Sequence, residues 1–205
     1  MPRRKATTAA EFLAQRENDP SFQEMMCEQK KQRAEQAQLE DHDEKELVLE
    51  CNKAGFSVKS VWDFINTEEK YEKALPILAR HLEVPHRPKI LNGIVRAIAV
   101  PQAWGIVSPK PLIRLFLEEK DPDSEIKWLL GMAISHTATL AEALEICELI
   151  ENESHGSSRE YLPWALIHCP SEAVVSYLTP YTQHPVLGKN ASKVIKRVKR
   201  RRTKA

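Results

Sequence analysis

The fold is decided by residues 74–99, ALPILARHL-EVPHRP-KILNGIVRAIA, because the form of this stretch repeats along the chain. An apolar segment is followed by a turn rich in Pro and polar residues, and then by a second apolar segment. The same form recurs in PLIRLFLEE-KDPDS-EIKWLLGMAIS (111–135) and ALEICELIE-NESHGSS-REYLPWALIHC (143–169), and more faintly in VVSYLTPY-TQHPVLGK-NASKVIKRV (174–198). Self-similarity at a nearly fixed period is typical of helical repeats.

The apolar residues within each repeat follow a helical period. Ala97, Ala133 and Ala165 align as the small residue of each second segment, with spacings of 36 and 32 residues. Apolar side chains such as Ile90 and Ile94 precede the first of them on one helical face. No segment shows the alternation of a half-buried strand. The sequence therefore predicts an all-α protein of helical hairpins that bury their apolar faces by stacking.

These residues resemble the HEAT-like, armadillo-type family of helical repeats between Tyr71 and about Val198. A basic residue stands six before the small residue at Lys127 and Arg159, as is common in HEAT second helices, while the first repeat has Leu91 there. The order VWDFIN, YEKALPILARHL, PHRP, GIVRAIAVP is also similar to bacterial proteins known as HEAT-repeat domains. The periods are shorter than the ~40–47 residues usual for HEAT. The resemblance implies a right-handed α-α superhelix, a short solenoid of about four hairpins, and no particular activity.

Composition divides the chain into three parts. Residues 1–55 form a charged N-terminal arm, in which Thr8–Arg16 is expected to be a short helix. The segment after Pro20 is expected to be a solvated helix or partly disordered, ending at Gly55. Residues 56–198 form the repeat domain, whose first helix is expected to be capped by Ser60 with Asp63. Residues 199–205 are a basic tail.

Cysteine usage and hydropathy predict a cytoplasmic protein. Its 205 residues include four dispersed cysteines, Cys27, Cys51, Cys147 and Cys169, which are expected to be free thiols. The basic N-terminus is not followed by the apolar stretch of a secretory signal. No window approaches ~18 consecutive apolar residues, so no membrane contact is expected.

No motif predicts catalysis, a cofactor or a metal site. The seven histidines are scattered. His86 and His155 fall in turns between helices and are expected to be solvated, while His136 and His168 occupy equivalent repeat positions. The turn ESHGSSRE (153–160) lacks the glycine spacing of a phosphate-binding loop, so Ser157 or Ser158 is expected to cap a helix.

The HEAT resemblance implies that second helices line the inner, concave face of the stack. Repeat alignment places two columns of residues there: Asn92, Trp128 and Glu160, and beside them Arg96, Met132 and Trp164. Trp and Arg are enriched at the energetic centres of interfaces. The tryptophans either form an exposed aromatic patch or wedge between adjacent second helices and are mostly buried.

The resulting hypothesis is a non-enzymatic scaffold that binds another protein through this face. One alternative is nucleic-acid binding through the basic tail, with Arg200, Arg201, Arg202 and Lys204 as contacts. A class of DNA glycosylase is built from HEAT-like repeats, but it needs a basic groove, and residues 51–188 hold 13 basic and 17 acidic residues. A second alternative is an immunity or antitoxin protein whose acidic surface masks a basic toxin.

Overall fold

The computed structural model describes Thr8 and residues 19–202, so the helix expected at Thr8–Arg16 lies outside the described residues. The chain divides into two compact units, Met1–His42 and Asp43–Ala205. Helix α2 (Pro20–Lys53) contributes to both. In its first part, residues 21–39 are exposed or partly exposed and carry side-chain bonds along the helix, such as Gln32 Nε2 to Glu28 Oε1 at 3.1 Å. This part is a solvated helix.

The last turns of α2 begin the second unit. Leu47 and Cys51 are fully buried there, and the helix ends at Lys53, ahead of Gly55 at a φ of +99°. Such a φ is unfavourable for residues with a Cβ, which explains glycine at this position. The short 3₁₀ helix η1 (Val61–Phe64) follows, and its predicted cap is confirmed: Ser60 accepts from Trp62 N, and Asp63 accepts from the Ser60 backbone.

Helices account for all the regular structure in the described residues, so the all-α prediction is confirmed. Four successive pairs of helices make up most of the second unit, joined by short 3₁₀ segments: α3 (Leu75–His81) with α4 (Pro88–Ile98), α5 (Lys110–Glu118) with α6 (Glu125–Thr137), α7 (Ala143–Glu151) with η5 (Leu162–His168), and α8 (Ser171–Leu178) with α9 (Gly188–Arg202). The joining segments are η2 (Pro101–Ala103), η3 (Leu140–Glu142), η4 (Glu153–Arg159) and η6 (Thr179–Gln183).

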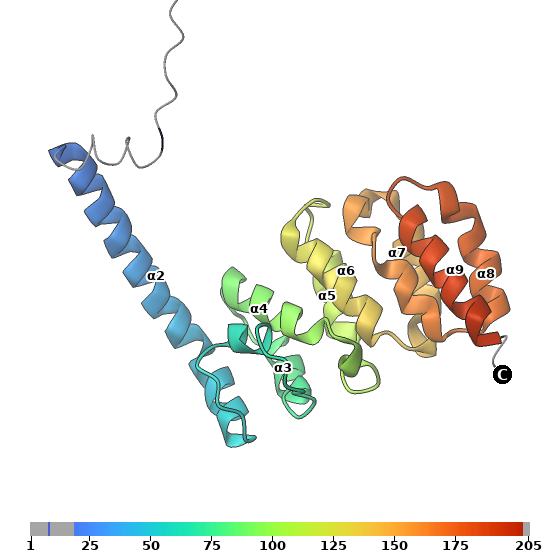
Figure 1. Ribbon diagram of the computed structural model, residues 1–205, viewed down its shortest axis with the longest axis horizontal. Coiled ribbons are helices and arrows are strands. Elements are labelled where there is room, and N and C mark those ends of the chain that lie inside the picture. The colour runs from blue at the N-terminus through green and yellow to red at the C-terminus, as the bar shows by residue number, and fades with distance from the viewer. Residues whose placement is uncertain (1–7, 9–18, 203–205) are drawn as a thin grey trace, which may run out of the picture. The chain divides into compact units, whose positions relative to one another are not determined.

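The pairs follow one another in chain order within the second unit (Figure 1). The members of each pair contact each other, and the second members also form a series: α4 contacts α6, α6 contacts η5, and η5 contacts α9. The buried apolar side chains of these helices, such as Ile94, Leu130 and Leu166, belong to one continuous core.

Two equivalent residues show that the second and third pairs share local chemistry. Lys127 Nζ donates to the Glu119 carbonyl at 2.6 Å, and Arg159 Nη1 donates to the Ile150 carbonyl at 2.7 Å. Both cations are buried, and both carbonyls lie at the C-terminal end of the first helix of their own pair. A cation at that end satisfies a free carbonyl and interacts favourably with the helix dipole.

The third pair departs from the sequence prediction in its second half. One helix was expected over 159–169, but η4 ends at Arg159 and the 3₁₀ helix η5 begins only at Leu162. Pro163 lies in this stretch, and the hydrogen bonds around it are the tighter 3₁₀ kind, including Trp164 N to the Tyr161 carbonyl at 3.0 Å.

The prediction for Ser157 and Ser158 as helix caps is wrong. Ser158 Oγ donates to the Pro122 carbonyl at 2.7 Å, and Ser157 Oγ donates to Asp123 Oδ1 at 3.0 Å. These bonds tie the turn to the preceding repeat. Both serines lie inside η4, which is capped by Asn152, and η5 has no side-chain cap. Gly131 permits this approach, because a Cβ there would lie 2.4 Å from the Ser158 carbonyl oxygen.

The expectation that His86 and His155 are solvated is also wrong. The His86 side chain is buried beside His81, with His81 Nδ1 and His86 Nε2 3.0 Å apart. His155 is buried with its ring edge against Phe116. Both turns fold back onto the core, and this long-range packing leaves no local signal in the sequence.

Candidate functional site

Most of the side chains predicted for the partner-binding face form hydrogen bonds or ion pairs within the protein. Arg96 Nε donates to Asn92 Oδ1 at 2.7 Å, and the same guanidinium forms an ion pair with Glu125 at the start of α6. The charge of Arg96 is therefore matched within the protein. Met132 is half-buried against the core.

Each of the two tryptophans bonds to a residue of the next repeat. Trp128 Nε1 donates to Glu160 Oε2 at 3.3 Å, and Trp164 Nε1 donates to Asn190 Oδ1 of α9 at 3.0 Å. Asn190 is buried and donates in turn to the Glu160 carbonyl at 2.8 Å. Both indoles are half-buried. They occupy the space between neighbouring helices while leaving part of each ring accessible.

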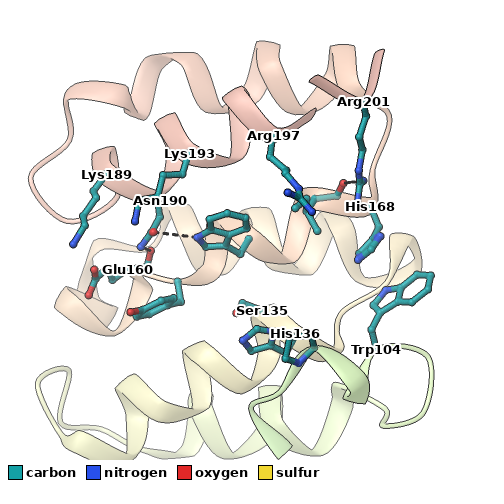
Figure 2. Close-up of a pocket in the computed structure, with 14 residues that line it drawn as sticks. Trp104, Ser135, His136, Glu160, His168, Lys189, Asn190, Lys193, Arg197 and Arg201 are labelled. Carbon is teal, nitrogen blue, oxygen red and sulfur yellow. Dashed lines mark hydrogen bonds between the residues drawn. The ribbon is translucent and has the colours of Figure 1, made fainter. Parts of the chain in front are cut away.

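A pocket of about 570 Å³ lies beside this network, between the end of α6, helix η5 and helix α9. Of the six residues predicted for the partner-binding face, Glu160 and Trp164 line it, whereas Asn92, Arg96, Trp128 and Met132 do not. The segment around η2 contributes Trp104. Figure 2 shows Lys189, Lys193, Arg197 and Arg201 in a row along one side of the pocket, with Trp104 and His168 at one end and Glu160 at the other.

The row of cations on α9 follows from its spacing, since residues four apart share one face of a helix. Glu160 is the one acidic residue that lines the pocket. Arg201 Nη1 donates to the Ile167 carbonyl at 2.7 Å, at the end of η5. In the described part of the chain, no side chain forms an ion pair or hydrogen bond with Lys189, Lys193 or Arg197. We call these three residues the basic row.

The residues predicted for the nucleic-acid-binding tail are separated by the structure. Arg201 reaches the pocket, while Arg200 lies in a different surface depression with Lys196 and Lys199. Arg202 ends α9, but its side chain and the whole of Lys204 lie outside the described residues. The tail boundary expected at residue 199 falls inside α9, which runs without a break from Gly188 to Arg202.

Aromatic rings face the basic row. Trp104 stacks on His168 with ring centroids 4.2 Å apart and planes 21° from parallel, and 47% of Trp104 remains exposed. Burial lowers the pKa of His136, and burial together with the Arg201 charge lowers the pKa of His168. Both imidazoles are therefore mostly neutral at pH 7, so at that pH they add uncharged aromatic rings to the pocket.

The pocket has one serine hydroxyl, that of Ser135. Ser135 Oγ is the pocket hydroxyl beside His136, and it donates to the Met132 carbonyl at 2.6 Å instead of to a histidine. Burial raises the pKa of Cys147 and Cys169, which keeps them as thiols at neutral pH. No cluster of three His, Cys, Asp or Glu side chains within the described residues is arranged to hold a metal ion.

Sequence reasoning missed Trp104 and the basic row. Trp104 lies between helices in AVPQAWGIVSP (99–109), which has no periodicity to place it. The basic row did leave a signal: Lys189, Lys193, Arg197 and Arg201 are spaced by four, which predicts one helical face. The position of that face relative to η5 and α6 depends on packing.

No protein-family model, curated protein sequence or solved structure matched this chain in the three comparisons. Within the residues that the structure describes, no helix combines the length and the apolar character needed to cross a membrane.

Proposed function

We propose that this chain is a non-enzymatic binding scaffold, a short solenoid of the HEAT-like kind, which holds an anionic partner in the pocket beside α9. The solenoid part of the proposal is supported by the contacts between successive second helices and by the shared roles of Lys127 and Arg159. The four cysteines are free, which fits a reducing compartment, and we include a cytoplasmic location in the proposal.

One observation carries the choice of partner: the three cations of the basic row lie along a pocket whose one acidic lining residue, Glu160, accepts a hydrogen bond from Trp128 and forms no ion pair with them. Like charges four residues apart on a helix repel each other and cost roughly 0.2–0.5 kcal/mol per pair. An anionic ligand removes this repulsion and is attracted by all three charges at once. The net charge of residues 51–188 gave no hint of this site, because the basic residues that line it begin at Lys189.

This pocket does not suit an inhibitor that masks a basic toxin, because such an inhibitor needs an acidic surface at the point of contact. The charge of the basic row also limits which protein could bind at this pocket. A protein partner for this face must be acidic, and Glu160 and Trp164 are the residues of the predicted face that it would meet.

Retention on immobilised heparin, a simple polyanion, tests the proposal. We expect Lys189→Gln, Lys193→Gln and Arg197→Gln, made together, to elute the full chain at clearly lower salt than the wild type. The matched control is Lys196→Gln, Lys199→Gln and Arg200→Gln, which removes two Lys and one Arg from another face of α9. All six residues are exposed, so each change should alter stability by no more than about 0.5 kcal/mol. If both triple variants elute at the same salt, the pocket is not the anion-binding site.

A further inference from the structure

We infer that the anionic partner is a single strand of nucleic acid, with its phosphates along the basic row and its bases against the aromatic side of the pocket. This inference rests on the proposed function and names the class of its ligand. It depends on the way the pocket combines two features: a row of unpaired cations on α9, and accessible aromatic rings on η5 and beside η2.

The cations are arranged as a chain of phosphates requires. Successive members of the basic row are four residues apart, which corresponds to a rise of about 6 Å along the helix. From Lys189 to Arg197 the basic row extends about 12 Å, and with Arg201, one further step along α9, the cations that line the pocket cover about 18 Å. At 3.4 Å or more per nucleotide, this length accommodates no more than about five nucleotides. A strand lying along α9 would therefore meet one cation after another.

The rest of the pocket lining offers flat rings. Trp104 is about half exposed although it stacks on His168, and Trp164 is held by the bond from its indole N–H to Asn190. Tyr161 also lines the pocket, where it packs edge-on against Trp128 at 5.2 Å between centroids. Aromatic rings held in place by neighbours are good stacking surfaces, since little conformational freedom remains to be lost.

A single strand fits this pairing better than a duplex or an acidic peptide does. The bases of a duplex are stacked on one another and present only their edges, so the aromatic rings would be unused. An acidic peptide supplies the negative charges, but it has a flat surface only where it carries an aromatic side chain. Each nucleotide of a single strand brings one phosphate and one ring, which are the two elements that the pocket matches.

Fluorescence anisotropy with labelled oligonucleotides tests the inference on the full chain. The probes are an oligothymidylate and an oligouridylate of about twelve nucleotides and a DNA duplex of the same length. We expect a single strand to bind more tightly than the duplex, and the comparison of the two strands shows whether DNA or RNA is preferred. We expect Trp104→Ala to weaken single-strand binding roughly 5- to 100-fold, the loss typical of removing one stacked base.

The matched control for Trp104→Ala is Ile106→Ala, which removes an exposed apolar side chain from the same loop and should leave binding unchanged. Trp104→Ala should leave heparin retention intact, because it removes no charge. If the duplex binds as tightly as the strands, or if Trp104→Ala has no effect, the single-strand inference is wrong. If polyglutamate displaces the strand more effectively than an unlabelled strand of equal charge, the partner is an acidic protein segment. In either case, heparin retention that depends on the basic row would still support the proposed function.

Discussion

His155 is a buried ring whose environment opposes a positive charge. It is 6% exposed, its ring lies edge-on to Phe116 at 4.9 Å between centroids, and its Nδ1 has no hydrogen-bond partner. Burial is the main cause that lowers the pKa of His155, followed by the charges of Lys127 and Arg159. Neutral imidazole is therefore part of the packing between the second and third repeats.

The lowered pKa of His155 predicts how stability depends on pH. Above pH ~6.5 the ring is neutral in both the folded and the unfolded chain, so its contribution to stability is fully present. As the pH falls below ~6.5, the unfolded chain binds the proton first, and stability is lost until the pH passes the folded pKa. We expect His155→Gln to make the free energy of unfolding less steep between pH 7 and pH 5, as measured by urea denaturation.

The control for this measurement is His42→Gln, at an exposed position of α2. Some pH dependence should remain in the His155 variant, because burial also lowers the pKa of His81 and His136. A wild type and a His155→Gln variant with parallel pH profiles would show that this ring does not contribute in the way described.

The end of α2 is the element where sequence and structure divide the chain differently. The sequence placed the boundary of the charged arm at residue 55, whereas the second compact unit begins at Asp43. Glu44 is buried, and its Oε2 accepts from Val61 N at 2.9 Å and from Ser60 Oγ at 3.0 Å. In the sequence, Glu44 is one of many acidic residues in this helix, so its structural role had no visible signal.

We expect Glu44→Ala to lower the free energy of unfolding by about 1–3 kcal/mol, because the buried Val61 N–H would lose its acceptor. Glu46→Ala, at an exposed position of the same helix, should change the free energy of unfolding by no more than about 0.5 kcal/mol.

Shortened chains test the same contact. Residues 43–205 alone should unfold cooperatively in urea with nearly the stability of the full chain, whereas a chain that starts at Glu46 should be less stable. Equal stability of the two shortened chains would contradict this role of Glu44.

The helix pairs were predictable because each depends on local information. Apolar residues at helical spacing mark the buried faces, and segments such as KDPDS (120–124) mark the turns between helices. The predictions failed where contacts between residues far apart in the sequence determine the local structure. Ser157 and Ser158 bond to the preceding repeat, and Pro163 lies where a continuous helix was expected. Sequence periodicity carries no record of such contacts.

At the scale of the whole molecule, the distribution of charge matters more than its sum. The formal net charge is +1, yet the last 17 residues contain nine Lys or Arg and no acid. In the sequence, the end of this segment was predicted to be a tail separate from the repeats. In the structure, most of the segment belongs to α9, which is the second helix of the last pair and forms one side of the pocket. The charge excess was visible in the sequence, but the surface that it faces required the fold.

The most direct test is the salt dependence of single-strand binding by the two triple variants on α9. For single strands, the slope of log K against log salt concentration changes by about 0.7 for each phosphate contact. We predict that Lys189→Gln, Lys193→Gln and Arg197→Gln together make this slope shallower by about 2. The matched variant with Lys196→Gln, Lys199→Gln and Arg200→Gln should keep the wild-type slope. Equal slopes for the two variants, or no measurable binding by the wild type, would contradict the assignment of this pocket to a single strand.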